Sequence, residues 1–293
     1  MSKRLPPPRV AAIHDLSCFG RCALTVIIPT LSVMGYQVVP IPTAFLSTHT
    51  GGFTDLHFRD LTADMEATSE HFDRLGIAFR AIYTGFLGSA EQIRTVSEII
   101  ERFGGIPDES GKLPLILVDP VMGDDGALYS TYTPELMRGM RELCRHAQLL
   151  TPNLTEACFL TDTPYQDTLT MESEDAIAFA DALLDKLSAI TDGRIVITGI
   201  SLANGSLANV GRDEEKQRFT VIRPHEAKHY PGTGDLFASV LLGRLLDGTS
   251  LPDAVAAAAD FTSAVMHDSA AIDTPARDGV ALEYHLGRLI GQK

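Results

Sequence analysis

The sequence contains no tryptophan, only four cysteines and few basic residues, and it has no long apolar run. Its 24 lysines and arginines face 38 aspartates and glutamates, which gives a formal net charge of −14. This balance argues against a nucleic acid partner, because binding to a phosphate backbone needs clustered basic side chains. No segment approaches the roughly 18 consecutive apolar residues of a membrane-spanning helix, and the start of the chain lacks the apolar core of a signal peptide. We therefore expect a cytoplasmic protein that binds neither nucleic acid nor membrane.

The cysteines do not suggest a metal site or a disulfide framework. Cys18, Cys22, Cys144 and Cys158 contain no C-x-x-C pair, and the spacing of the first two matches no common zinc pattern. We expect buried, reduced thiols, as in a cytosolic protein. Whether Cys18 or Cys22 responds to redox conditions stays open, because thiol reactivity depends on a pKa that the sequence does not give.

Apolar runs typical of strands alternate with amphipathic helical stretches along the 293 residues. This alternation predicts an α/β fold with a mostly parallel central sheet and helices on both faces. Two short runs in residues 205–224 predict a small antiparallel hairpin. Residues 1–9 include three consecutive prolines and are expected to form a flexible tail, and residues 10–293 to form one domain. The expected strands are 9–15, 36–42, 81–85, 113–120, 147–153 and 194–200, and the expected helices are 20–34, 89–104, 171–188 and 251–267.

The segment G-T-G-D, Gly232 to Asp235, stands directly before an apolar helical stretch. Glycines let the backbone approach a ligand, and a helix amino terminus with its free N–H groups suits a phosphate or an oxyanion. The alternative is that Thr233 or Asp235 only caps the helix. Neither G-x-G-x-x-G nor the G-x-x-x-x-G-K-[ST] phosphate loop is present, so neither a dinucleotide-binding fold nor a P-loop is indicated.

Two further segments place oxygen ligands at strand ends, where the sites of parallel α/β sheets lie. Asp119 ends the strand of 113–120, and the glycines after it are typical of a mobile flap. Asn153 and Glu156 are three residues apart and share one face of a helix that begins there. Such ligands hold Mg²⁺ directly or through its waters. The alternative for this pair is a reciprocal helix cap.

The segments GFLGSAEQ, DPVMG, PNLTE and GTGDLFA, together with residues 12–52, resemble those of the ribokinase-like small-molecule kinases, and most of all the vitamin B6 kinases. The resemblance runs from about Val10 to the last helices. It implies a ribokinase-like three-layer α/β sandwich that uses ATP and Mg²⁺ to phosphorylate the 5′-hydroxymethyl group of pyridoxal, pyridoxine or pyridoxamine. It also implies a homodimer, and it leaves a requirement for a monovalent cation such as K⁺ open.

The resemblance assigns roles to individual residues of this chain. Asp235 would be the base that takes the proton from the substrate hydroxymethyl group, while the N–H groups of Gly232 to Gly234 stabilise the transferring phosphoryl group. Asp119, Asn153 and Glu156 would arrange the metal and the phosphates. The residues implied to contact the nucleotide are Asp119, Tyr129, Thr151, Asn153, Thr198, Gly232 and Thr233.

The substrate pocket is expected to use Asp15, Thr50 and Phe86 beside Asp235, with His49 either a ligand contact or a structural residue. The sequence departs here from the B6 kinases at three positions. Those kinases commonly have a serine where this chain has Asp15, and often a tyrosine where it has Phe86. Some of them have a flap cysteine where this chain has Ala127. A carboxylate at residue 15 favours an amino-bearing ring, so we hypothesise a bias toward pyridoxamine or the aminopyrimidine of thiamin synthesis. The alternative is that Asp15 caps a turn without touching substrate.

Two other functions remain open at this point. A hydroxymethylpyrimidine kinase would share the fold, the base and the ATP geometry, and would differ only in its ring pocket. A non-catalytic vitamer-binding regulator would be expected to lose the base or the glycines of the anion site. Gly232, Gly234 and Asp235 are all present, which favours catalysis.

Overall fold

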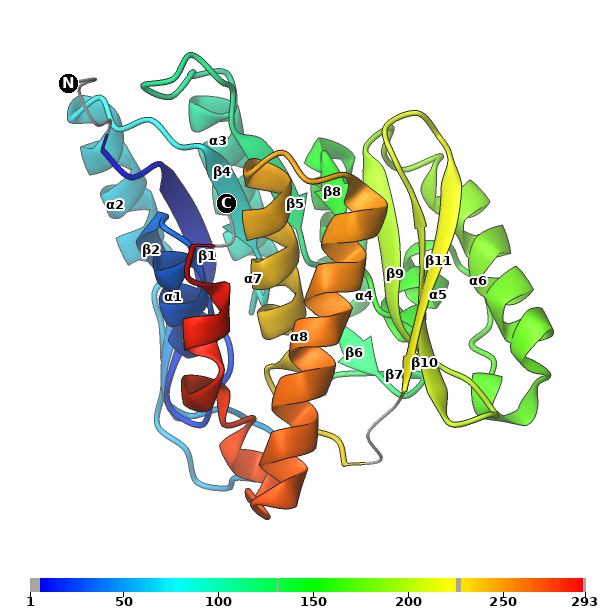
Figure 1. Ribbon diagram of the computed structural model, residues 1–293. Helices are drawn as coiled ribbons and strands as arrows, with labels where there is room; N and C mark the ends of the chain where they lie inside the picture. The colour runs from blue at the N-terminus through cyan, green and yellow to red at the C-terminus, as the bar shows by residue number, and fades with distance from the viewer. Residues whose placement is uncertain (1–5, 131, 225–227, 292–293) are drawn as a thin grey trace.

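The structure, a computed structural model, describes residues 6–130, 132–224 and 228–291, and these form a nine-stranded sheet with helices on both faces (Figure 1). The strand order is β11-β10-β9-β8-β5-β4-β1-β2-β3. The strands of this sheet are β1 (Arg9–Phe19), β2 (Gln37–Thr48), β3 (Phe58–Asp60), β4 (Ala81–Thr84), β5 (Leu115–Val118), β8 (Leu149–Leu150), β9 (Arg194–Ser201), β10 (Ser206–Arg212) and β11 (Arg218–Pro224).

The middle of the sheet is parallel and its two edges are antiparallel. Parallel pairing runs from β2 through β1, β4, β5 and β8 to β9. At one edge β10 and β11 form the predicted hairpin, and at the other β3 pairs antiparallel with β2. Parallel strands bring their carboxyl ends to one side of the sheet. The predicted α/β architecture is therefore confirmed.

Helices bury both faces of the sheet over two apolar cores. In β1, Ala11 and Ile13 belong to one core, while Val10 and Ala12 belong to the other, as the two-residue period of a strand buried on both faces requires. Helices α1, α7 and α8 lie in front of the sheet in Figure 1, and the others lie behind it. The helices are α1 (Leu24–Val33), α2 (Thr62–Arg74), α3 (Ala90–Phe103), α4 (Pro134–Leu143), α5 (Leu154–Leu160), α6 (Ser173–Leu187), α7 (Thr233–Leu246) and α8 (Leu251–Ala271).

Some element boundaries differ from those expected. The first helix begins at Leu24, not at residue 20, because a turn occupies residues 20–23. Strands β1 and β2 extend to Phe19 and Thr48, well beyond the apolar runs that predicted them. Strand β3 and helices α2 and α4 were not predicted. Of the expected tail, residues 1–5 lie outside the described residues, and β1 begins at Arg9.

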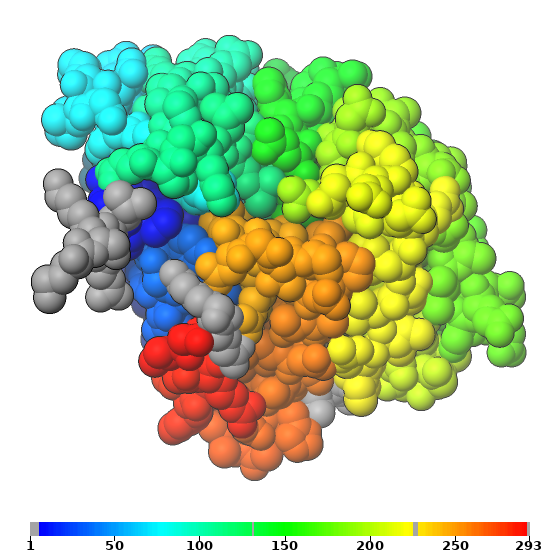
Figure 2. All heavy atoms as spheres, turned by 45° about the horizontal axis from the view of Figure 1, so that its top comes forward, coloured from blue at the N-terminus to red at the C-terminus, as the bar shows by residue number. Residues whose placement is uncertain are grey.

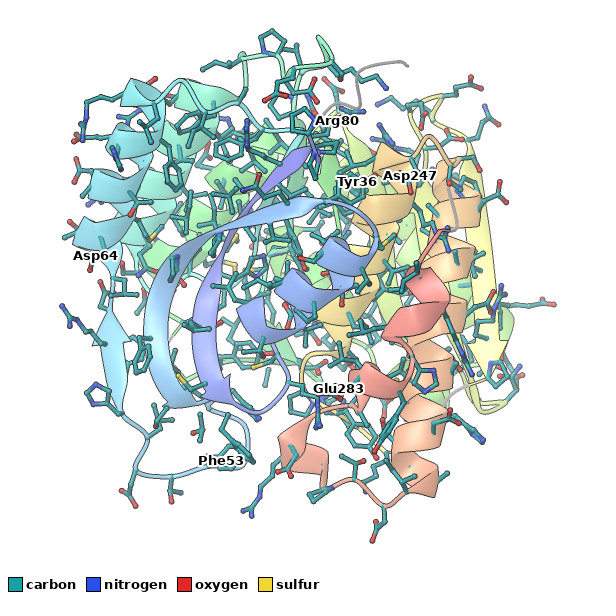
Figure 3. The ribbon with its side chains drawn as sticks, turned by 60° about the vertical axis from the view of Figure 1, so that its left-hand side comes forward. Tyr36, Phe53, Asp64, Arg80, Asp247 and Glu283 are labelled. Atoms are coloured by element: carbon teal, nitrogen blue, oxygen red, sulfur yellow. The ribbon has the colours of Figure 1, made fainter. Side chains whose placement is uncertain are left out.

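The two ends of the sheet are built from different residues, and only one of them holds the carboxyl termini of the parallel strands. Figure 3 shows Tyr36 and Asp247 at one end and Phe53 and Glu283 at the other. At the first end Tyr36 Oη donates to Asp247 Oδ1 at 2.6 Å and ties the start of β2 to the end of α7. Figure 2 brings this end forward, with α7 and α8 packed between the N-terminal segments and the hairpin strands. The other end holds the carboxyl termini of the parallel strands.

Within the described ranges, no helix is long and apolar enough to span a bilayer.

Candidate active site

The G-T-G-D segment forms the amino end of α7, as the sequence predicts. Gly232 is the N-cap, with a left-handed φ of 80°. A side chain does not fit there, because a Cβ on residue 232 would lie 2.1 Å from the Arg21 carbonyl oxygen. Thr233 Oγ1 donates to the Tyr230 carbonyl at 3.1 Å, while a Cβ on Gly234 would meet only open space. The first N–H groups of α7 lack acceptors within the helix, so this end of the helix suits an anion.

Asp235 is in the first turn of α7 and keeps one oxygen available. Its Oδ2 accepts a hydrogen bond from the Ala23 amide at 2.7 Å. Its Oδ1 lies 3.8 Å from His14 Nδ1 and has no hydrogen bond to any described residue. Burial, with a smaller effect from the charge of Asp15, raises the pKa of Asp235 to about 7. A carboxylate with this pKa and a free oxygen suits general-base catalysis at neutral pH. The alternative that Asp235 or Thr233 is the N-cap is wrong.

His14 is a buried, neutral neighbour of Asp235. Its ring stands edge-on to Tyr83 with centroids 4.3 Å apart, and burial lowers the pKa of His14 to about 3. Its Nε2 has no hydrogen-bond partner within the described part of the chain. Residue 85 is glycine because a Cβ there would lie 2.2 Å from the His14 ring. The imidazole therefore shields Asp235 from water without neutralising its charge.

Asp119 follows β5 and lies within electrostatic range of Asp235. It is 8% exposed, and Thr151 Oγ1 donates to its Oδ1 at 3.2 Å. Burial first, and the charge of Asp235 second, raise the pKa of Asp119. A cation next to these two carboxyl groups would offset both effects.

Asn153 and Glu156 form the reciprocal cap of α5, which is the alternative to a direct metal site. Asn153 Oδ1 accepts from the Glu156 amide at 2.8 Å, and Glu156 Oε2 accepts from the Asn153 amide at 2.8 Å. Glu156 Oε1 accepts from the Met122 amide at 3.0 Å, and Asn153 Nδ2 donates to the Gly123 carbonyl at 2.8 Å. Both side chains are thus held by the backbone, and only their second lone pairs remain for a metal-bound water.

The predicted flap is a short hairpin of β6 (Gly123–Asp124) and β7 (Ala127–Leu128). The Gly126 amide at its turn donates to Thr155 Oγ1 at 2.9 Å. Tyr129 follows the hairpin, and the residue is 43% exposed. Burial raises the pKa of its phenol, and nearby carboxylates raise it further. These carboxylates, largest effect first, are those of Glu156, Asp124, Asp235 and Asp119. Tyr129 therefore lies beside the acidic groups of the site.

Thr198 lies near the end of β9, next to the start of α5. It forms an isolated parallel bridge with Asn153, and its amide donates to the Pro152 carbonyl at 2.9 Å. The sheet thus brings together two residues that the sequence assigned to the nucleotide.

The residues assigned to the substrate lie in three separate segments. Asp15 in β1 is 8% exposed and accepts a hydrogen bond from Ser17 Oγ at 2.8 Å; burial is the main cause that raises its pKa. Phe86 is half-buried after β4, and Thr50 is exposed in the loop after β2. No described hydrogen bond connects Thr50 with Asp15 or Phe86.

His49 is held by the chain on both ring nitrogens. Its Nε2 lies 2.6 Å from the Arg277 carbonyl oxygen, and the Gly51 amide donates to Nδ1 at 3.0 Å. The ring also stands edge-on to Phe53 at 5.0 Å. This geometry favours the structural interpretation of His49 over a ligand contact.

The donor set fits a Mg²⁺ ion that is shared with a nucleotide. Among residues 6–130, 132–224 and 228–291, no cluster of three His, Cys, Asp or Glu side chains could hold a metal ion alone. Mg²⁺ keeps several waters and is usually bound by one or two carboxylates together with substrate phosphates. Asp119, whose side chain accepts a hydrogen bond only at Oδ1 among the described residues, provides such a carboxylate.

All four cysteines are free, and Cys18 is exposed while the other three are buried. The expectation of buried thiols is therefore wrong for Cys18, which stands near the end of β1. Burial first, then the charges of Asp235 and Asp15, raise the pKa of Cys22, so its thiol stays protonated at neutral pH.

Two features of the site were not predicted from the sequence: the hydrogen bond from the Ala23 amide to Asp235 and the position of His14 beside it. A backbone amide carries no residue-type signal, and the turn that directs it depends on an alanine with a φ of 47°, which is uncommon for a residue with a side chain. The sequence did contain a signal for His14. A histidine follows the apolar run of the first strand, and a glycine, residue 85, follows that of the strand beside it. Such a pair is typical of a ring that packs where the neighbouring residue has no side chain.

Comparison with known proteins places most of the chain among small-molecule kinases. The family model described as phosphomethylpyrimidine kinase matches residues 28–277. The pyridoxine/pyridoxal/pyridoxamine kinase of Bordetella avium is 30% identical over 285 residues, which cover 92% of this chain and 90% of that protein.

Solved structures agree in fold over nearly the full length. A Bacteroides thetaiotaomicron protein assigned as a phosphomethylpyrimidine kinase is 37% identical, with a TM-score of 0.86 over 99% of this chain and 96% of that chain. A second crystal form, with 36% identity and a TM-score of 0.82 over 97% and 96% of the two chains, contains pyridoxal. Pyridoxal kinase from Leishmania donovani, in complex with ADP and pyridoxamine, is 26% identical, with a TM-score of 0.78 over 96% and 95% of the two chains.

Proposed function

The chain belongs to the phosphomethylpyrimidine kinase family, and we propose that it transfers the γ-phosphoryl group of ATP to the 5′-hydroxymethyl group of a B6 vitamer. The vitamer is pyridoxal, pyridoxine or pyridoxamine, and the product is its 5′-phosphate. The relatives that bind pyridoxal, or ADP together with pyridoxamine, support this substrate pair. The protein is thus a phosphotransferase with an alcohol acceptor.

The position of Asp235 carries the proposal. Its Oδ2 is fixed by the Ala23 amide, which leaves Oδ1 to accept the proton of the substrate hydroxyl group. The pKa of about 7 keeps a large fraction of the carboxyl group ionised at neutral pH. A base of this kind accelerates proton transfer by about 10²–10⁴. The adjacent N–H groups at Gly232 to Gly234 face the position where the transferred phosphoryl group gains charge.

The opposite side of the site arranges the phosphates. Asp119 would bind the metal directly, while Asn153 and Glu156 would act through metal-bound waters. Thr151 orients Asp119, and Thr198 borders the same space. When bound, Mg²⁺ neutralises phosphate charge that this acidic protein would otherwise repel.

The β6–β7 hairpin and Tyr129 would cover the phosphates during the reaction. Water competes with the vitamer as phosphoryl acceptor, so exclusion of water protects ATP from hydrolysis. The Gly126 amide at the tip of the hairpin donates a hydrogen bond to the Thr155 hydroxyl, and movement of the tip over the phosphates would break this contact.

Asp15 supports a preference among the vitamers. Burial raises its pKa, whereas a cationic amino group of the substrate beside it would favour the ionised carboxylate and would be stabilised by it. We expect pyridoxamine to benefit most. The aminopyrimidine of thiamin synthesis offers a neutral amino donor to the same carboxylate, and the family name keeps hydroxymethylpyrimidine kinase activity as the second candidate.

An assay with four acceptors tests the proposal. ATP consumption with Mg²⁺ is measured side by side for pyridoxal, pyridoxine, pyridoxamine and hydroxymethylpyrimidine. We expect turnover of the B6 vitamers, led by pyridoxamine. Turnover of hydroxymethylpyrimidine alone would overturn the vitamer assignment and keep the mechanism. Binding of vitamer and ATP without any turnover would instead support the non-catalytic regulator.

Assembly, location and ion requirement rest on the resemblance to B6 kinases. We expect a homodimer in the cytoplasm, and sedimentation of the purified protein tests the oligomeric state. Replacing K⁺ with Na⁺ or tetramethylammonium in the same assay tests the monovalent cation.

A further inference from the structure

The turn before α1 directs a backbone amide at Asp235. Residues 22–25 form a turn that is closed by a hydrogen bond from the Thr25 amide to the Cys22 carbonyl at 3.2 Å. Its second residue, Ala23, has φ 47° and ψ −132°, which are the angles of the first central residue of a type II′ turn, a position that favours glycine. An alanine keeps such angles only where its surroundings hold it there.

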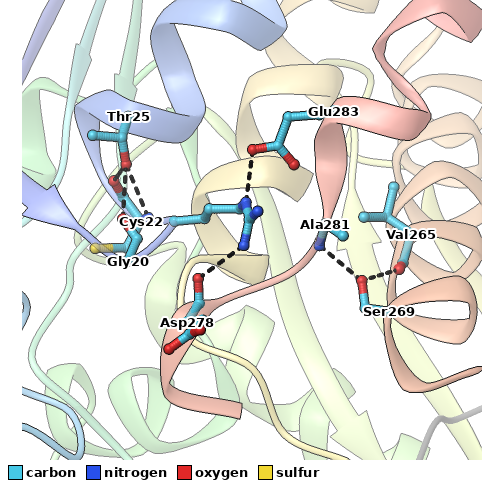
Figure 4. Close-up of polar contacts among 9 residues, drawn as sticks. Gly20, Cys22, Thr25, Val265, Ser269, Asp278, Ala281 and Glu283 are labelled. Carbon is cyan, nitrogen blue, oxygen red and sulfur yellow. Dashed lines mark hydrogen bonds and ion pairs between the residues drawn. The ribbon is translucent and has the colours of Figure 1, made fainter. Parts of the chain in front are cut away.

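The surroundings of this turn come from the C-terminal segment. The Arg21 amide donates to the Asp278 carbonyl at 3.1 Å. The Arg21 guanidinium donates from Nη1 to the same carbonyl at 3.3 Å and from Nε to Glu283 Oε1 at 2.7 Å (Figure 4). Gly279 packs so closely that a Cβ there would lie 2.7 Å from the Arg21 carbonyl oxygen. The backbone and the side chain of Arg21 are thus both attached to residues 278–283.

The C-terminal segment is itself anchored to α8. Buried Ser269 donates to the Val265 carbonyl at 2.6 Å and accepts from the Ala281 amide at 2.8 Å (Figure 4). On its other side the turn touches α7, because the Arg21 carbonyl oxygen occupies the space that a side chain on Gly232 would need. The turn is therefore clamped between the end of the chain and the anion-binding helix.

We infer that Arg21 and Glu283 are positioning residues for the phosphoryl transfer, because they hold the turn whose Ala23 amide orients the Asp235 carboxylate. This inference rests on the proposed function of Asp235 as the base. The contacts act on Oδ2, so they fix which oxygen is left for the substrate hydroxyl group. A displacement of about 1 Å at a reacting group costs up to about a hundredfold in rate.

Loss of the Ala23 hydrogen bond has a defined effect on titration. This bond lowers the pKa of Asp235 against the larger effect of burial, so its loss raises that pKa further. The other titratable groups within electrostatic range of Asp235 are His14, Asp15, Cys22, Tyr83, Asp119 and Tyr129. Apart from Cys22, which follows Arg21 in the chain, none of them forms a hydrogen bond or an ion pair with Arg21 among the described residues; the partners of Arg21 are Asp278 and Glu283. A change at Arg21 therefore reaches Asp235 through the turn.

The test compares Arg21→Ala, Arg21→Lys, Glu283→Gln and the double variant Arg21→Ala/Glu283→Gln. Arg145→Ala serves as the control, because Arg145 forms a surface ion pair with Glu142 at 2.9 Å. We expect Arg21→Ala to lower kcat by about 10- to 100-fold, with little change in KM for ATP and an acidic limb of the pH–kcat profile shifted to higher pH. The double variant should be no slower than Arg21→Ala, because the two residues act as one unit.

Arg21→Lys should recover part of the rate, since an ammonium group can reach Glu283 but cannot reproduce both guanidinium contacts. A pH limb in Arg21→Ala that matches the wild type would overturn the inference, even if the melting temperature fell. Carbon NMR titration of the Asp235 carboxyl group measures the same pKa without turnover. If the wild type lacks kinase activity but this titration shifts in Arg21→Ala, the proposed function fails and the positioning contact stands; if turnover is normal and the titration does not shift, only the inference fails.

Discussion

Asp235 and Glu156 occupy equivalent places in two helices that meet at one site, yet their carboxylates are used in opposite ways. Each is the third residue after its N-cap. In α5 the N-cap is Asn153, and the two side chains satisfy each other's backbone amides. In α7 the N-cap is Gly232, which has no side chain to exchange, so Asp235 bonds the Ala23 amide and leaves Oδ1 open.

The N-cap residue therefore decides whether a first-turn acid stabilises its helix or serves chemistry. Glu156 gives both oxygens to amides, those of Asn153 and Met122. Asp235 gives only one. A glycine N-cap costs the helix a side-chain hydrogen bond, but it opens the helix end to an anion and frees the acid beside it.

The largest effect should come from Asp235→Asn, which keeps the shape of the side chain and removes its basicity. We expect kcat to fall by about 10²–10⁴ while the vitamer still binds. Turnover assays and vitamer titration measure the two quantities. Glu156→Gln is the matched change in α5 and should lower kcat less, because Glu156 would act on the metal only through a bound water. An equal loss in both variants would contradict the division of roles.

The next effect is on stability, and it should appear at Glu156. In Glu156→Ala the buried amide of Met122 and the partly buried amide of Asn153 lose their acceptor, at a cost of about 1–3 kcal/mol for a buried donor left unpaired. Urea unfolding measures the loss. Glu135→Ala, an exposed first-turn position of α4, should change the free energy of unfolding by less than about 0.5 kcal/mol. A loss at Glu156 no larger than this control would show that the cap contributes little.

The raised pKa of Asp235 makes activity and stability depend on pH in opposite directions. The base acts when ionised, so kcat/KM should rise as pH increases through about 7. Between the usual aspartate pKa of about 4 and this value the folded state binds more protons than the unfolded state, so the free energy of unfolding falls as pH rises. Asp235→Asn should flatten this fall. A stability that rises with pH over this range in the wild type, and not in Asp235→Asn, would contradict the assignment.

The alternation of apolar runs was sufficient to predict the parallel sheet, its hairpin and α3, α6 and α8, because period and length identify buried strands and amphipathic helices. It did not predict β3 or α2, whose sequences are largely polar and exposed. Asp119, Asn153, Glu156 and Asp235 were identified as acids and amides at strand or helix ends, and the structure gathers them at one site.

The sequence could not predict which hydrogen bonds each side-chain oxygen of the site forms. Asn153 and Glu156 fit both a metal site and a capping box, and only the positions of the Met122 and Gly123 backbone decide how their atoms are engaged. The Ala23 amide reaches Asp235 through a pairing between residues more than two hundred positions apart, and no residue pattern encodes that contact. Likewise, the sequence does not distinguish Arg21 from an ordinary surface cation, because its partners Asp278 and Glu283 lie far along the chain.

A smaller effect on specificity should distinguish the substrate side from the phosphate side. Asp15→Ser removes the carboxylate that would face an amino group, and a hydrogen bond to a charged group is worth about 1.5–3 kcal/mol. We expect kcat/KM for pyridoxamine to fall by about tenfold or more relative to pyridoxal, with KM for ATP unchanged. Parallel assays with the two vitamers measure the ratio. An unchanged ratio would mean that Asp15 only binds Ser17.

The smallest effect should come from Ala23→Gly, which separates the stability of the turn from the hydrogen bond that its amide donates to Asp235. Glycine relieves the unfavourable angles of Ala23 but loses chain entropy on folding, so we expect a gain of about 1 kcal/mol or less in the free energy of unfolding. At exposed Ala178 inside α6, the same change should cost about 1 kcal/mol. Because a freer turn directs its amide less firmly, kcat should fall by about two- to threefold, less than the loss from a 1 Å displacement. If Ala23→Gly lowers the free energy of unfolding, the turn is unstrained. The contacts of Arg21 with residues 278–283 would then have no strain to oppose.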